Sequence, residues 1–107
     1  MDAQLKRGIL DVCVLAAMRT KDTYGYQIIK DISPVIQVSE STLYPILKRL
    51  EEGGCVVSYT SQHNGRLRKY YRLTSIGKER INDFLNDWDS IMRAYSYIRG
   101  DDEDEQK

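Results

Sequence analysis

The chain has 107 residues, and its 16 Lys and Arg balance 16 Asp and Glu, so the formal net charge is zero. That length suits one domain, and the two cysteines, Cys13 and Cys55, have neither the number nor the spacing of a disulfide framework or a zinc site. The start of the chain lacks a signal peptide's apolar stretch and no apolar run is long enough to span a bilayer, so we expect a cytoplasmic protein without a membrane partner.

Two helical patterns open the chain. Apolar residues recur at helical spacing over residues 3–19, which predicts a helix buried on more than one side. Asp22 and Thr23 are N-cap residue types, and they precede a second helical pattern at residues 24–32. Ser33-Pro34 is expected to end that helix, because the residue before a proline avoids the helical region.

A third helix is predicted from Ser39, an N-cap residue type, to the Gly53-Gly54 pair that ends it. The segment before it, Val35–Val38, is short and mostly β-branched, and this predicts a brief strand. Pro45 lies inside the predicted helix, where proline removes a hydrogen bond and clashes with the preceding turn. We therefore expect a tolerated kink.

A hairpin and a long helix complete the pattern. Residues 55–62 and 67–73 predict two strands, and the intervening Asn64-Gly65 pair is the strongest short-range signal of a hairpin turn. Thr74 is the expected N-cap of a last helix that Gly100 ends.

Three helices followed by a two-stranded wing indicate a mainly α (α+β) fold, the winged helix-turn-helix, with an additional long C-terminal helix. We assign residues 1–74 to a winged-helix domain that binds DNA and residues 75–99 to the helix of a dimer. The like-charge block in residues 100–107 predicts a disordered acidic tail.

The charges are distributed unevenly along the chain. Residues 1–80 hold 13 Lys and Arg against 8 Asp and Glu, whereas residues 81–107 hold 3 against 8. Contacts with phosphates need an excess of cations. The basic part of the chain supplies that excess, although the total charge alone argues against a nucleic-acid partner.

The start of the third helix is the expected base-reading element, because a helix fits the major groove. Its hydroxyl side chains suit contacts with bases or phosphates, and helix capping alone explains them equally well. The hairpin holds four cations and no acid between Cys55 and Arg72, which exceeds what protection of a sheet edge requires and favours contact with a DNA backbone. The predicted DNA-contacting residues are Tyr24, Tyr26, Ser39, Ser41, Thr42, Tyr44, Lys48, Arg49, Asn64, Arg66, Arg68 and Lys69.

Three segments in this order resemble the signature of PadR-type transcriptional regulators: Tyr24-Gly25-Tyr26, then residues 41–51 (STLYPILKRLE), then residues 65–74 (GRLRKYYRLT). The resemblance covers about residues 5–98 and includes the proline within the third helix. It departs from the family at Leu67, where many members have proline, and at Thr23, where histidine is common. The resemblance implies the small form of the family, a repressor with one C-terminal dimerisation helix.

The apolar stripe of the last helix is too long for one small winged helix to bury, so we expect a homodimer. A twofold dimer suits a pseudo-palindromic operator in duplex DNA, with half-sites about 34 Å apart or a multiple of that distance. The predicted interface comprises Leu5, Ile9, Phe84, Leu85, Trp88, Ile91, Met92 and Tyr95.

Trp88, the single tryptophan, has two interpretations. Tryptophan is enriched at interface hot spots, which favours an anchor of the dimer. Similarity to the multidrug-sensing members implies instead that two copies of this residue enclose a planar aromatic effector. The matching positions that would line such a site are Val12, Ala16, Ile81, Leu85, Trp88 and Met92.

The sequence argues against an enzyme. His63 is the single histidine and lies beside the hairpin turn, so a Ser-His-Asp triad has no histidine in the core. No glycine-rich phosphate loop is present, and we expect neither a cofactor nor a metal. The predicted function is a homodimeric, sequence-specific repressor that a small molecule or a stress signal releases. The alternative is a dimeric ligand-binding or interaction protein that no longer binds DNA.

Overall fold

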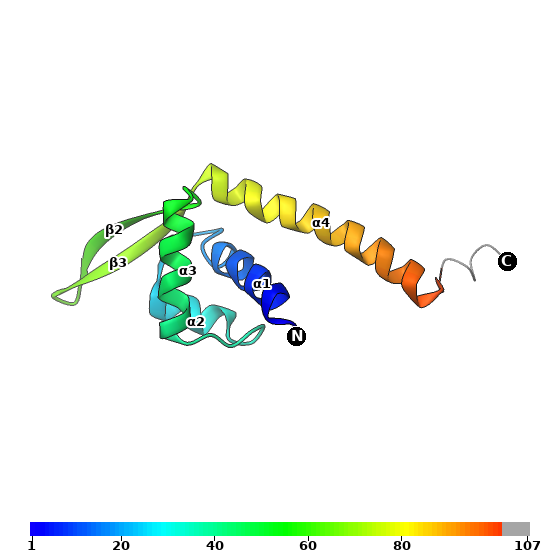
Figure 1. Cartoon of the computed structure of the whole chain (residues 1–107). Helices are drawn as coiled ribbons and strands as arrows, with labels where there is room; N and C mark the ends of the chain where they lie inside the picture. Colours follow the sequence, from blue (N-terminus) through cyan, green and yellow to red (C-terminus); the bar gives the residue numbers. More distant parts are fainter. Residues whose placement is uncertain (102–107) are drawn as a thin grey trace.

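The computed structural model describes residues 1–101, in which four helices and three strands alternate in the order α1, β1, α2, α3, β2, β3, α4 (Figure 1). Their bounds are Ala3–Ala16 for α1, Thr23–Tyr24 for β1, Gly25–Ile32 for α2, Glu40–Glu52 for α3, Val56–His63 for β2, Arg66–Leu73 for β3 and Ser75–Arg99 for α4. The predicted fold, a mainly helical winged helix-turn-helix with a long C-terminal helix, is confirmed.

The three strands form one antiparallel sheet in the order β1-β3-β2. The wing strands pair along their full length, from Val56 opposite Leu73 to His63 opposite Arg66. The predicted strand at residues 35–38 is wrong, because that segment is a loop in which Ile36 and Val38 pack against the core. The actual third strand is β1, whose two residues are too few to show the alternation by which a strand is recognised.

Side-chain caps define where three of the helices begin. Asp2 accepts hydrogen bonds from the backbone of Gln4 and Leu5 at the start of α1, and Thr74 accepts one from Gly77 at the start of α4. The prediction that Asp22 or Thr23 caps the second helix is wrong. That helix begins after Tyr24, and the residues described here provide it with no side-chain cap bond.

The core lies between the helices and the inner face of the wing. Its most completely buried side chains are Leu15, Ile28, Leu43, Leu47, Leu50, Val14 and Val56. Tyr71 and Leu73 add the inner face of β3, as the alternation along that strand predicts. α3 continues through Pro45 without a break and ends before Gly53-Gly54, so the core gains three buried leucines from one helix.

The long helix α4 packs against the core only at its start. Gly77 and Ile81 are its buried residues, and Figure 1 shows the helix continuing well past α1 into solvent. Gly100 ends it in the left-handed conformation at φ 90°, as predicted, and most of the predicted acidic tail lies outside the described residues. None of the helices in residues 1–101 combines the length and apolar character that a membrane crossing needs.

Candidate nucleic-acid interface

The first turn of α3 carries a network of hydroxyl groups. Ser39 accepts a hydrogen bond from the Thr42 backbone at 3.3 Å, and its Oγ lies 3.0 Å from Ser41 Oγ and 3.2 Å from Thr42 Oγ1. Capping is therefore one role of these residues. All three side chains are also exposed, so the same turn presents hydroxyls to a partner.

The Tyr-Gly-Tyr segment contacts the recognition helix directly. A Cβ atom placed on Gly25 would lie 2.5 Å from Tyr44 Oη and 2.9 Å from Cζ of the same ring, so the absence of a side chain there makes room for Tyr44. Tyr26 follows with 58% of its surface exposed, and Lys30 lies 5.5 Å from its ring centroid. Gly25 is thus a positioning residue that sequence reasoning did not select, although the motif itself was the signal.

The wing turns tightly at Asn64 and Gly65, whose φ angles of 52° and 78° are both positive, as the Asn-Gly signal predicts. Arg66 is exposed at this tip. The Arg68 guanidinium lies 3.9 Å from the centroid of the Tyr24 ring, a cation–π contact that joins the wing to β1.

A surface pocket brings three separate segments together. It is lined by residues of α2 and the adjoining β1, of α3 and of β3, and contains five predicted DNA contacts: Tyr24, Tyr26, Tyr44, Arg68 and Lys69. Lys48 lines the adjoining pocket, where Glu51 and Glu52 also lie. Asn64 and Arg66 at the wing tip, and Ser39, Ser41 and Thr42 at the start of α3, are absent from the lining of these two pockets.

Two arginines in this region are held by carboxylates. Arg49, a predicted phosphate contact, bonds Asp11 of α1 at 2.6 Å, so its guanidinium lies on the side of α3 away from the wing. Arg72 bonds Asp22 at 3.0 Å, and Tyr59 donates a second hydrogen bond to the same carboxylate at 2.6 Å. The bond from Arg72, and then that from Tyr59, lower the pKa of Asp22 below its usual value.

Residues 14–83 match the model of the transcriptional regulator PadR-like family. The chain belongs to this family. An uncharacterized protein of Lysinibacillus sphaericus is 37% identical over 90 residues, which are 79% of this chain and 83% of that protein. Members of the family are transcriptional regulators and not enzymes, in agreement with the sequence.

Solved structures of PadR-family proteins share the fold. A regulator from Clostridium difficile superposes with a TM-score of 0.76 and 33% identity, covering 85% of this chain and 98% of that one. The Bacillus subtilis PadR structure in complex with operator DNA has a TM-score of 0.66 and 28% identity over 72% of this chain and 47% of that chain. PadR itself therefore contains a further region without a counterpart in this match.

The predicted interface residues of this PadR-like chain retain exposed surface in the single chain. Leu5, Leu85, Ile91, Met92 and Tyr95 are between 43% and 54% exposed, whereas Ile9, Phe84 and Trp88 are half-buried. Phe84 and Trp88 stack with their ring centroids 6.0 Å apart and their planes 19° apart. Among the predicted ligand-lining residues, Val12 and Ala16 are half-buried, but Ile81 is 7% exposed and belongs to the core of the single chain.

Proposed function

We propose that this PadR-like chain is a homodimeric repressor that binds duplex DNA in a sequence-specific manner. The observation that carries the proposal is the meeting of the Tyr-Gly-Tyr segment, α3 and the cationic strand β3 around one surface pocket. Family membership and the operator complex of Bacillus subtilis PadR support the choice of DNA as partner. The cations on this surface provide the sequence-independent part of the affinity.

The surface divides into two kinds of contact. The exposed hydroxyls of Ser41, Thr42 and Tyr44 on α3 enter the major groove and meet base edges. Arg66, Arg68 and Lys69 of the wing meet phosphates, which set the register of the protein but carry no sequence information. Stacking on Tyr24 holds Arg68 in place before DNA arrives, which reduces the conformational freedom lost on binding.

Dimerisation through α4 and α1 follows from the apolar side chains that the single chain leaves exposed. Leu85, Ile91, Met92 and Tyr95 recur at helical spacing along a helix that leaves the body of the protein. A contiguous apolar surface of this kind is typical of an interface. A second copy that covers this stripe would place two recognition helices in a fixed relation, as a pseudo-palindromic operator requires.

A planar aromatic effector is the proposed releasing signal. Phe84 and Trp88 offer a pair of stacked rings on the same stretch of α4, and Val12 and Ala16 offer small apolar side chains on α1. Such walls suit flat apolar cations, because the rings attract both the aromatic face and the charge. Binding there would alter the spacing of the two recognition helices and thereby lower DNA affinity.

Selection of bound fragments from a genomic DNA library, with the purified full chain, tests the DNA function. We expect enrichment of fragments that contain a pseudo-palindrome, and we expect that enrichment to be lost when Tyr44 is replaced by Ala. Absence of enriched fragments at low salt would contradict DNA binding and favour a protein that acts only through its dimer helix. Transcription from an enriched promoter, with and without the protein, distinguishes repression from activation.

Fluorescence of the single tryptophan tests the effector site. A panel of planar cationic dyes is expected to quench Trp88 and to lower the affinity for an enriched DNA fragment. Trp88→Phe should retain part of the dye binding, whereas Trp88→Ala should abolish it. Unquenched fluorescence across the panel would contradict this site while leaving the DNA function unaffected.

A further inference from the structure

A second cationic surface flanks the recognition helix on the side away from the wing. A groove between α1 and α3 is lined by Ala3, Lys6, Arg7, Leu10, Thr42, Pro45, Ile46 and Arg49. Leu10 and Ile46 are buried and form its floor, while Lys6 and Arg7 are exposed and have no ion-pair partner within residues 1–101. The groove therefore combines an apolar floor with a cationic rim.

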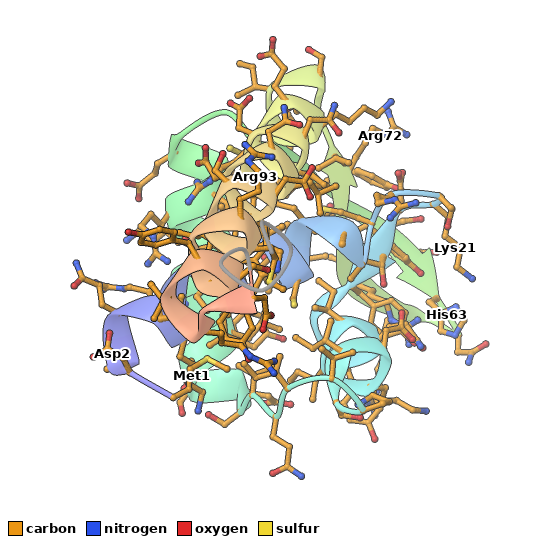
Figure 2. The ribbon with its side chains drawn as sticks, turned by 90° about the vertical axis from the view of Figure 1, so that its right-hand side faces the viewer. Met1, Asp2, Lys21, His63, Arg72 and Arg93 are labelled. Carbon is orange, nitrogen blue, oxygen red and sulfur yellow. The ribbon has the colours of Figure 1, made fainter. Side chains whose placement is uncertain are left out.

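The position of this groove suits the DNA strand that the wing does not reach. Figure 1 shows the N-terminus of α1 at the same end of the molecule as the start of α3, whereas α4 begins at the opposite end. In Figure 2, Asp2 at the start of α1 and His63 at the end of β2 lie on opposite sides of the molecule. The groove and the wing thus lie on the two sides of the base-reading helix.

Asp11 controls one of the groove's three cations. Its side chain, 6% exposed, receives a bond from Arg49 of α3 at 2.6 Å and one from Arg80 of α4 at 3.0 Å. One carboxylate thus has two guanidinium partners, each more than two-fifths exposed, and the three groups together carry one surplus positive charge. A single guanidinium is enough to balance Asp11, so the other can leave without stranding a buried charge.

We infer that the α1–α3 groove binds a backbone phosphate of DNA through Lys6, Arg7 and Arg49, and that Arg49 moves from Asp11 to this phosphate while Arg80 keeps Asp11 paired. The inference rests on the proposed DNA function and adds a contact and a form of control to it. Because Arg80 belongs to α4, the position of the dimerisation helix decides whether Asp11 can release Arg49. The charges of the recognition surface are thereby coupled to the helix that carries the proposed effector site.

The salt dependence of binding to a random-sequence 30-base-pair duplex tests this inference without knowledge of the operator. Phosphate contacts are sequence-independent, and each one lost lowers the slope of log affinity against log salt by about 0.9. Arg80→Gln leaves Arg49 as the sole partner of Asp11, so we expect the slope to fall by about 0.9 per bound protomer and the affinity at 0.1 M salt to fall about eightfold. Arg93→Gln is the matched control, since Arg93 lies on the same helix and bonds only Ser90 among the described residues.

A double-variant cycle shows whether Arg80 acts through Arg49. Arg49→Gln alone should reproduce the loss seen in Arg80→Gln, and the two changes together should cause no larger loss. Adding Asp11→Asn to Arg80→Gln should restore the slope, because Arg49 is then no longer held by a charge. Circular dichroism and thermal unfolding confirm that each variant is folded, and the cycle of the two half-exposed arginines remains decisive where the buried Asp11→Asn change prevents folding.

The outcomes separate this inference from the function on which it rests. A slope for Arg80→Gln equal to that of Arg93→Gln overturns the inference, as do additive losses in the Arg49→Gln and Arg80→Gln double variant. Both results leave DNA binding by the wild-type chain in place. A wild-type chain that binds no duplex at low salt overturns the proposed function and the inference together.

Discussion

The winged-helix body, residues 1–81, and the distal helix, residues 82–99, use apolar side chains in opposite ways. In the body, Leu43 and Leu50 of the recognition helix are completely buried. In the distal helix, Ile91 and Tyr95 are 48% and 47% exposed although they recur with the same helical spacing. The body is stabilised by contacts within one chain, whereas the distal helix has an apolar face that one chain leaves unburied. Stability and assembly should therefore respond to different residues.

Leu47→Ala should produce the largest loss of stability, because this residue is 1% exposed in the centre of the body. Removal of a buried leucine side chain costs about 2–5 kcal/mol of unfolding free energy, since apolar contacts are lost and a cavity remains. Urea unfolding followed by circular dichroism measures the change. Val57→Ala is the control, since Val57 is 47% exposed on the wing, and should cost less than about 1 kcal/mol. Similar losses in both variants would contradict the core assignment.

Ile91→Ala should weaken self-association while leaving the body folded. Truncation of an interface hot-spot residue costs about 1–3 kcal/mol, or roughly tenfold to a hundredfold in the dimer dissociation constant. Sedimentation over a range of protein concentrations measures that constant. Asn86→Ala, an exposed change on the same helix, should leave it unaltered. Equal dissociation constants for Ile91→Ala and the wild type would remove Ile91 from the interface.

Local signals made much of the fold predictable from the sequence. Ser39 and Thr74 were expected as helix caps and accept the backbone bonds of caps. Gly100 and the Asn64-Gly65 turn have the positive φ angles that their residue types favour. These features depend on residues a few positions apart, so a pattern along the chain contains the information needed to find them.

Pairs that are distant in sequence were not predictable in the same way. Asp22 has the residue type of a helix cap, but it pairs with Arg72, 50 positions later. Asp11 is the one acid within the apolar stripe of α1, and that exception was a signal, although neither Arg49 nor Arg80 could be named as its partner without the fold. Gly25 belonged to a recognised motif, yet its contact with Tyr44 depends on how two helices cross.

Arg68→Ala should weaken DNA binding and leave both body stability and self-association nearly unchanged. Loss of one phosphate contact should lower the salt slope by about 0.9 per protomer and the affinity at 0.1 M salt about eightfold. Fluorescence anisotropy with a labelled duplex measures both quantities. Arg72→Ala, a change of equal charge on the same strand, should alter the slope less because Arg72 is paired with Asp22. A salt slope identical to that of the wild type would exclude Arg68 as a phosphate contact.

The pH dependence of the Asp22 pair should be the smallest effect, and it belongs to the body alone. Bonds from Arg72 and Tyr59 lower the pKa of Asp22, so the stabilisation is present above the ordinary aspartate pKa of about 3.9 and is lost as pH falls through the lower folded-state value. Thermal unfolding of the wild type and Asp22→Asn from pH 7 to pH 3 should show a difference in midpoint that narrows below about pH 4. Both partners lie partly in solvent, which screens the attraction and keeps this difference small. A difference that stays constant over the whole range would show that the charge of Asp22 contributes nothing to the junction of β1 and the wing.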